Sequence, residues 1–139
     1  MATMNRPLPK FPEPDTQPFW DATKSHELRY QVCNDCKKVV FYPRRHCTHC
    51  LSLNLTWKVS KGEGVIYTYS VVRQNRHPAF AELGAYAIGF IDLDEGFRMM
   101  SNIVGVADPT KDVKIGQRVK VEWQDQGEGN VSLPMFRPI

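Results

Sequence analysis

The sequence predicts a mainly β fold in which two small modules follow an N-terminal arm. Three observations favour this fold class. Four cysteines stand in two close pairs within residues 33–50, period-two strand patterns begin at residue 28, and no long helical pattern occurs after that position. The chain has 139 residues, 42% of them hydrophobic, which suits two small modules with a modest core.

The N-terminal arm, residues 1–28, is predicted to be extended first and helical afterwards. Its first part contains four of the ten prolines and favours a polyproline-like chain: Pro7, Pro9, Pro12 and Pro14. Asp15 or Thr16 then offers an N-cap, and Pro18 suits the first helical turn. The apolar side of this helix comprises Phe19, Trp20, Thr23 and Leu28. Two interpretations stay open, because the aromatic side chains either pack on the chain's own core or dock onto a partner protein.

The cysteines follow the spacing C-x2-C-x10-C-x2-C and none occurs elsewhere in the chain: Cys33, Cys36, Cys47 and Cys50. Two such turns bring four thiolates to one point at tetrahedral spacing, which is typical of structural zinc, with iron as the alternative occupant. A secreted disulfide scaffold would spread its bridges through the chain. His46 and His49 are weaker candidate ligands because four thiolates already close the coordination shell, and we expect His49 to face solvent. The metal is predicted to hold residues 29–60 as a small ribbon that could not fold alone.

Short strands are predicted on both sides of the cysteine turns, at residues 28–33, 39–43 and 55–60. Five further strands are predicted for a second module, residues 61–139: 62–74, 86–93, 97–104, 118–125 and 131–136. The first has Gly62 and Gly64 at its head, where a strand often bulges or bends. Gly96 allows the hairpin turn between the second and third strands. Five antiparallel strands with one long connection fit a closed Greek-key barrel, most simply an OB-fold.

The long connection, residues 75–85, is the loop on which a binding function is expected, since loops on a rigid barrel commonly carry binding. Arg76 offers a guanidinium to a phosphate or carboxylate, and His77 offers an imidazole that could move a proton. Pro78 and Phe80 follow, and Phe80 offers an apolar contact. The alternative is a solvent-facing loop with one buried Phe. No serine nucleophile elbow, phosphate-binding glycine loop or metal-ligating histidine pair is present in the sequence.

Charge and hydropathy limit the classes of partner. The net charge of +3 is far from the basic stripe that nucleic-acid binding usually needs. A single-stranded nucleic-acid-binding function stays open as an alternative, because four aromatic residues of the barrel could stack on bases: Tyr67, Tyr69, Phe90 and Phe97. The sequence has no apolar run long enough to span a membrane and no secretory signal pattern, so we expect a soluble, cytoplasmic protein without a membrane partner.

Five segments between Pro14 and Pro138 carry a family resemblance: "PDTQPFWDATKSHELRYQVCNDCKKVVFYPRRHC", "WKVSKGEGVIYTYSVVRQNRHPAF", "AIGFIDLDEGFRMMSNIVG", "VKIGQRVKVEW" and "LPMFRP". Together they resemble a known family of stand-alone zinc-ribbon and OB-fold proteins, catalogued as domain of unknown function thirty-five. The sequence departs from the family at two positions. Lys37 stands where a glycine usually follows the second cysteine, and Lys61 replaces a frequent serine.

The resemblance implies a rubredoxin-like ribbon, an OB-fold and an accessory subunit of a thiolase-like enzyme. By this resemblance the four cysteines are the metal ligands, Phe19 and Trp20 are the arm aromatics, and the loop "RHPAF" approaches a partner's active site. Some relatives work with a lipid-transfer-protein-like thiolase homologue in bacterial steroid breakdown, where the pair cleaves a 3-hydroxyacyl-CoA by a retro-aldol reaction. A stand-alone acyl-CoA-binding module is a further alternative.

Overall fold

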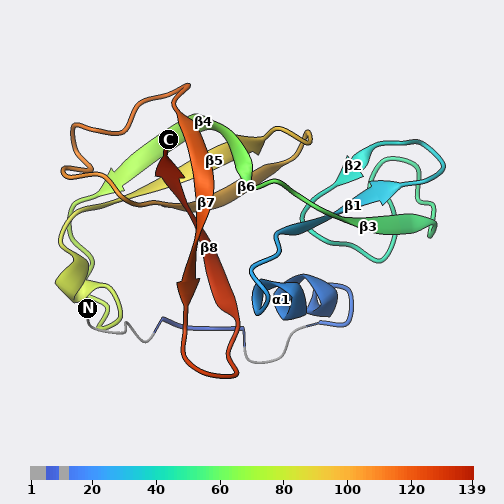
Figure 1. The fold of residues 1–139 in the computed structure, drawn as a ribbon, viewed down its shortest axis with the longest axis horizontal. Coiled ribbons are helices and arrows are strands. Elements are labelled where there is room, and N and C mark those ends of the chain that lie inside the picture. The colour runs from blue at the N-terminus through green and yellow to red at the C-terminus, as the bar shows by residue number, and fades with distance from the viewer. Residues whose placement is uncertain (1–5, 10–12) are drawn as a thin grey trace.

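The computed structural model describes residues 6–9 and 13–139, and it confirms the predicted mainly β fold. A three-stranded sheet and a closed five-stranded barrel lie side by side, with one short helix below their junction (Figure 1). No helix in the described part of the chain is long and apolar enough to cross a membrane. Of the prolines that predict a polyproline-like stretch, Pro7 and Pro9 lie in the described residues 6–9, which form neither helix nor strand, whereas Pro12 lies outside the described residues.

The helix α1 spans Gln17–Thr23 and begins where the sequence predicts. Thr16 is its N-cap residue and Pro18 lies in the first turn, where the missing proline N–H costs no helical hydrogen bond. Thr23 is fully buried at the other end. Its hydroxyl donates to the Trp20 carbonyl at 2.6 Å and accepts the Ser132 N–H at 3.2 Å, so the helix is tied to the last strand of the barrel.

The sheet of the ribbon has the order β2-β1-β3, with all pairs antiparallel. Strands β1 and β3 span Arg29–Cys33 and Leu55–Val59, close to their predicted bounds. Strand β2 is only Val39–Val40, shorter than predicted, because the chain leaves the sheet before Pro43. Gln31, which is 4% exposed, holds that departing segment with two hydrogen bonds of 2.8 Å to the backbone of Arg44.

The barrel has the strand order β4-β5-β6-β8-β7. Its strands are β4 (Glu63–Val72), β5 (Tyr86–Leu93), β6 (Arg98–Ile103), β7 (Arg118–Asp125) and β8 (Ser132–Pro138), with a 3-10 turn η1 (Ala81–Leu83) in the long loop. The bend in β4 lies at a register shift between Ile66 and Thr68, not at the glycines as predicted. Gly64 is needed for another reason, since a Cβ there would lie 2.2 Å from the Asp92 carbonyl oxygen.

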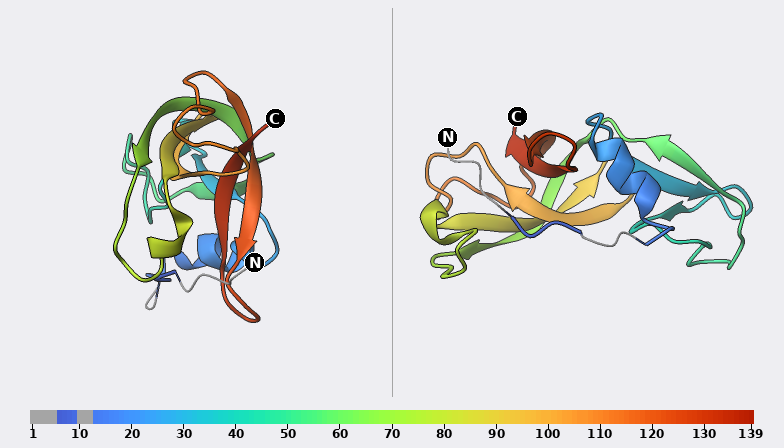
Figure 2. Two further views of the ribbon diagram at one scale, coloured as in Figure 1. Left: turned by 90° about the vertical axis from the view of Figure 1, so that its left-hand side faces the viewer. Right: turned by 90° about the horizontal axis from the view of Figure 1, so that it is seen from below.

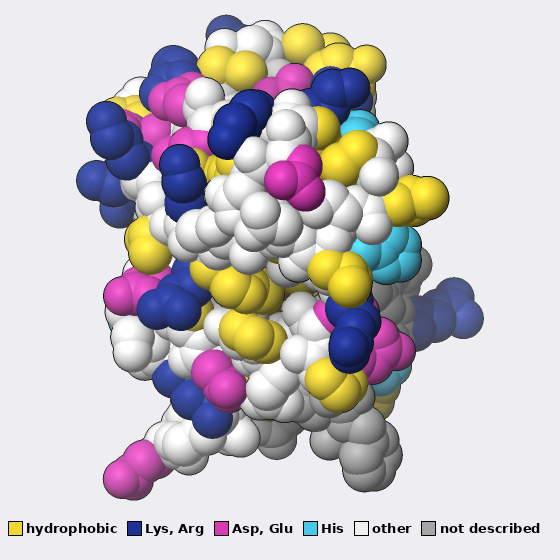
Figure 3. All heavy atoms as spheres, turned by 90° about the vertical axis from the view of Figure 1, so that its right-hand side faces the viewer, with side chains coloured by type: hydrophobic (Ala, Val, Ile, Leu, Met, Phe, Trp, Pro, Cys, Tyr) yellow, Lys and Arg dark blue, Asp and Glu magenta, His cyan; other side chains and the backbone are white. Residues whose placement is uncertain are grey.

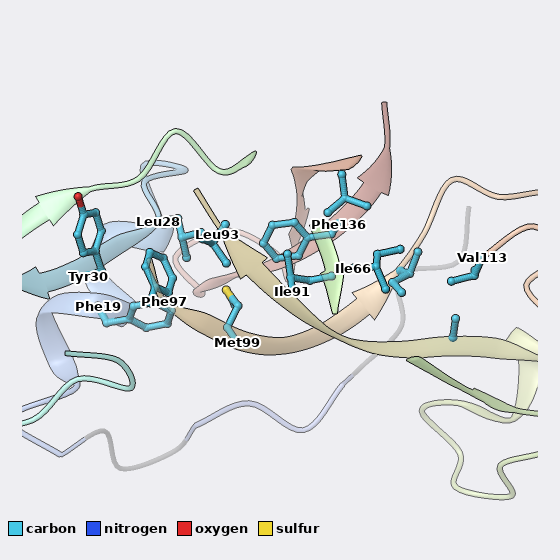
Figure 4. Close-up of a cluster of buried hydrophobic side chains, with 13 residues drawn as sticks. Phe19, Leu28, Tyr30, Ile66, Ile91, Leu93, Phe97, Met99, Val113 and Phe136 are labelled. Carbon is cyan, nitrogen blue, oxygen red and sulfur yellow. The ribbon is translucent and has the colours of Figure 1, made fainter. Parts of the chain in front are cut away.

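One continuous hydrophobic core joins the barrel to the arm and the ribbon. Figure 4 shows it running from Phe136 and Ile91 inside the barrel to Phe97, Phe19 and Tyr30 at the junction. Phe97 stacks on Tyr30 at a centroid distance of 5.1 Å and lies 4.7 Å from the ring of Phe41. Because this aromatic cluster draws on both modules, the ribbon is packed against the barrel and is not merely tethered to it.

Hydrogen bonds also fix the short connection between the two modules. Glu95, in the β5–β6 turn, accepts the Ser60 hydroxyl at 2.6 Å and the Lys61 N–H at 2.9 Å. The Ser60 N–H donates to the Leu28 carbonyl at 2.7 Å. The view from below in Figure 2 shows the resulting elongated molecule, with the barrel and the ribbon at opposite ends.

Candidate metal centre and aromatic groove

The four cysteine sulfurs converge as the spacing predicts. All four Sγ atoms lie within 4.8 Å of one another, and the Cys33–Cys50 and Cys36–Cys47 pairs are each 3.6 Å apart. A tetrahedral zinc with Zn–S bonds of about 2.3 Å places its sulfurs about 3.8 Å apart, so the donor set fits this metal. His46 and His49 are exposed, and neither belongs to the sulfur cluster found in the described chain.

Backbone N–H groups in the two cysteine turns donate to cysteine sulfurs. The Cys36 N–H donates to Cys33 Sγ at 3.5 Å, and the His49 N–H donates to Cys47 Sγ at 3.3 Å. The pKa of the Cys33 thiol is lowered to about 7, because the bond from the Cys36 N–H, with smaller contributions from the Asp35 N–H and the neighbouring sulfurs, outweighs burial. Such bonds favour the thiolate, which is the form that binds zinc. The ribbon is therefore a structural zinc site, closed by four sulfurs and without an open coordination position.

The two turns are equivalent in backbone conformation and are tied together by side chains. Lys37 and Leu51, each directly after the second cysteine of its pair, both have φ of +67°. Asn34 donates to the Asn54 side chain at 2.9 Å, and the Ser52 hydroxyl donates to Asp35. Figure 3 views this end of the molecule and shows hydrophobic side chains interspersed with Lys and Arg around it.

Replacing Lys37 with glycine is expected to stabilise the zinc-loaded protein by about 0.5 to 1 kcal/mol. The left-handed backbone costs an L-residue about 1–2 kcal/mol, of which about 0.4–1 kcal/mol is offset by the extra entropy that glycine gives the unfolded chain. Urea unfolding measures the difference. Lys38→Gly is the matched control, because Lys38 is equally exposed and is not among the positive-φ residues, so this change should destabilise. A shift of the same sign in both variants would contradict the explanation.

A second candidate site is an aromatic groove of about 400 Å³ on the barrel side of the junction. Strands β6 and β8 pair at only one position, Ile103↔Phe136, and the groove opens where they separate. Met99 and Met100 line it from β6, and Leu133 and Met135 line it from β8. The arm and the long loop add aromatic rings from three predicted positions: Phe19, Trp20 and Phe80.

The arm aromatics differ from each other in exposure. Phe19 is 6% exposed and packs on the chain's own core, so for this residue the structure favours the first of the two interpretations. Trp20 is half-buried beside it, with the two rings edge to face at 5.1 Å. Contact of either residue with a partner stays a prediction.

The long loop is held in shape by its own polar groups. The His77 N–H donates to the Asn75 side chain at 3.0 Å, and His77 Nδ1 accepts the Ala79 N–H at 3.1 Å. Phe80 is half-buried and stacks on Tyr86 at 6.0 Å. Arg76, His77 and Pro78 are exposed and do not line the groove, so of the predicted loop residues only Phe80 meets the arm aromatics there.

Several residues of the groove were not found by sequence analysis, including Arg6, Tyr86 and the Met99–Asn102 segment. Arg6 donates to Asn102 Oδ1 at 3.1 Å and lies 5.2 Å from the centre of the Phe80 ring. Figure 1 shows the described part of the arm running below the barrel. No local pattern in the sequence reports these contacts, because they join residues 96 and 74 positions apart.

Two of the four aromatic residues considered for nucleic-acid stacking have other contacts. Phe97, which that alternative counted as a platform, is 6% exposed and lies in the core. Arg98 lies 3.5 Å from the centre of the Tyr67 ring, which is 51% exposed, and Arg98 is itself paired with Asp92 at 2.6 Å. Phe97 is therefore not available for stacking on bases, and the charge of Arg98 is already paired with a carboxylate.

Comparison with known proteins finds a matching family model for each of the two modules. Residues 20–56 match the family model described as the rubredoxin-like zinc ribbon domain of ChsH2, and residues 57–124 match its C-terminal OB-fold domain. A solved chain described as the Ltp2-ChsH2(DUF35) aldolase superposes with a TM-score of 0.82 at 33% identity, covering 94% of this chain and 98% of that one.

The curated relatives include a protein of similar length and two much longer subunits. A DUF35 domain-containing scaffold protein of Methanocaldococcus jannaschii is 32% identical, over 77% of this chain and 78% of its own length. A probable enoyl-CoA hydratase alpha subunit of Thermomonospora curvata is 36% identical over 86% of this chain, and a 3-oxo-4,17-pregnadiene-20-carboxyl-CoA hydratase alpha subunit of Mycobacterium tuberculosis is 32% identical over 80%. This chain spans only 36% and 34% of the length of those two subunits. From its paired modules and these matches, the chain belongs to the DUF35 family of zinc-ribbon and OB-fold proteins of the ChsH2 type.

Proposed function

We propose that this chain is the accessory subunit of a thiolase-like or lipid-transfer-protein-like enzyme that cleaves a 3-hydroxyacyl-CoA by a retro-aldol reaction in steroid or lipid degradation. The observation that carries the proposal is the match to the Ltp2-ChsH2(DUF35) aldolase over nearly the whole of both chains. The relatives named as a scaffold protein and as a steroid-CoA hydratase subunit support an accessory role in acyl-CoA chemistry.

Retro-aldol cleavage needs a base that removes the hydroxyl proton and donors that stabilise the thioester enolate. In this proposal the partner subunit holds both. The arm and the loop 75–85 of this chain close the acyl channel and exclude water from it. Convergence of Trp20 and Phe80 on one groove supports these separate roles of the two subunits, because it gathers half-buried apolar surface from two segments distant in sequence. The exposed Arg76 and His77 are then candidates to meet the phosphates of CoA, with Pro78 beside them.

We further propose the division of the chain into the arm (1–28), the zinc ribbon (29–60) and the OB-fold (61–139). In this division the zinc ribbon and the core of Figure 4 serve as the rigid support, and the arm and the loop serve as the contact segments.

Co-purification tests the proposed partner. The tagged chain, isolated from its native cell, should bring down a thiolase-like protein identified by mass spectrometry. Trp20→Ser should reduce that recovery about tenfold or more, since aromatic interface residues often contribute 2 kcal/mol or more. Ile115→Ser is the matched control, because Ile115 is 68% exposed and lies away from the groove. Recovery of no acyl-CoA enzyme, combined with salt-sensitive binding of a single-stranded oligonucleotide, would instead favour the nucleic-acid alternative.

A further inference from the structure

The aromatic groove combines an apolar lining with one charged side chain among the described residues. Its volume of about 400 Å³ lies in the range of small-molecule sites, and its lining is almost entirely apolar and aromatic. Arg6 is the only charged residue among the described residues that line it. Most such sites combine an apolar wall with a few polar groups that orient the ligand, and Arg6 and Asn102 have that place here.

Arg6 has no carboxylate partner. One guanidinium nitrogen donates to Asn102 Oδ1, the Phe80 ring lies beside the group, and Nε is buried without a hydrogen-bond partner among the described residues. No ion pair of Arg6 occurs in the described chain, and residues 1–5 and 10–12 include no Asp or Glu. Burial lowers the pKa of Arg6, against a smaller opposing effect of Tyr86, as expected for a cation removed from water without a counterion.

We propose that the groove binds an amphipathic carboxylate, a small molecule whose apolar body lies against the β6 and β8 walls and whose carboxylate pairs with Arg6. A guanidinium with an unused Nε–H offers a charge-assisted hydrogen bond, which a carboxylate matches in geometry and in sign. The methionine walls suit an apolar body of variable shape, since Met side chains adapt to what they contact. This inference goes beyond the proposed function, because the site lies on this chain alone and needs no partner subunit.

Binding is tested on the full, zinc-loaded chain with three probes, each at concentrations where it is dissolved as single molecules: dodecanoate, dodecanol and acetate. Trp20 lines the groove, so its fluorescence should change on binding, and calorimetry gives the affinity without relying on that signal. Dodecanoate should bind saturably and at least about tenfold more tightly than dodecanol, because a hydrogen bond between two charged groups is stronger than one to a neutral hydroxyl. Acetate should not bind measurably, since it lacks the apolar body.

Two variants test whether the carboxylate of the probe binds at Arg6. Arg6→Met should weaken dodecanoate about tenfold or more and leave dodecanol as it was. Lys111→Met is the matched control, since Lys111 is an exposed cation outside the groove, and it should leave both affinities unchanged. Equal affinity for dodecanoate and dodecanol, an Arg6→Met variant that binds both like the parent, or the absence of saturable binding would each overturn the inference. None of these results bears on the accessory role, because no partner is present in the assay.

Discussion

Cys47→Ser is expected to abolish stoichiometric zinc binding and to unfold the ribbon, with a loss of stability greater than about 4 kcal/mol, the range reached when a structural metal is lost. Cys47 is fully buried and supplies one of the four clustered sulfurs, so the variant leaves a hydroxyl among three thiolates. The second cluster of buried side chains in the described chain contains little besides Val40 and the cysteines, and it cannot replace the metal. Metal analysis of the purified variant and thermal unfolding followed by circular dichroism measure the two effects.

Thr48→Ser provides the control for that experiment. Thr48 is exposed and lies in the same turn, between the two cysteines of the second pair, so its replacement should leave the zinc content and the melting temperature nearly unchanged. A Cys47→Ser protein that melts like the parent would show that the fold does not depend on the metal, contrary to the structural role assigned to it.

Phe97→Ala is the second change with a large expected effect, a loss of about 3–5 kcal/mol in the free energy of unfolding. Its ring is 6% exposed and contacts Tyr30 from the ribbon sheet and Phe41 from the segment after β2. Removing it leaves a cavity at the interface that orients the ribbon on the barrel. Urea unfolding measures the loss.

Phe90→Ala is the comparison that isolates burial from aromatic character. Phe90 lies on the neighbouring strand β5 and is 40% exposed, so its truncation should cost no more than about 1 kcal/mol. Similar losses in both variants would mean that the Phe97 cluster contributes no more to stability than a partly exposed ring.

The strands with the clearest local patterns could be predicted best. β5 and β7 coincide with their predicted bounds, because strict alternation and flanking turn residues define both. β2 is shorter than its apolar run suggested, since the bonds from Gln31 draw the chain away at Arg44. The glycines at the head of β4 were assigned to a bend, whereas Gly62 and Gly64 instead allow close approach to Val121 and Asp92. Such contacts depend on tertiary neighbours that a local pattern does not contain.

The metal centre was predictable, but the groove was not. Cysteine spacing determines which four sulfurs meet, because each turn is a local structure. The groove arises where two strands pair at only one position and where the arm contacts the barrel through Arg6, and neither leaves a local signal. For the same reason the sequence left the role of Phe19 open. An amphipathic helix has the same sequence pattern whether its apolar side packs on its own core or on a partner protein.

Reconstitution of the proposed pair tests the central claim most directly. The purified chain, its co-purified thiolase-like partner and the mixture are each assayed for cleavage of a 3-hydroxyacyl-CoA, with steroid side-chain and linear acyl groups compared. We expect no cleavage by the chain alone, little by the partner alone and full activity in the mixture, reduced by Trp20→Ser but not by Ile115→Ser. Full activity of the partner alone, or cleavage by this chain alone, would contradict the accessory role.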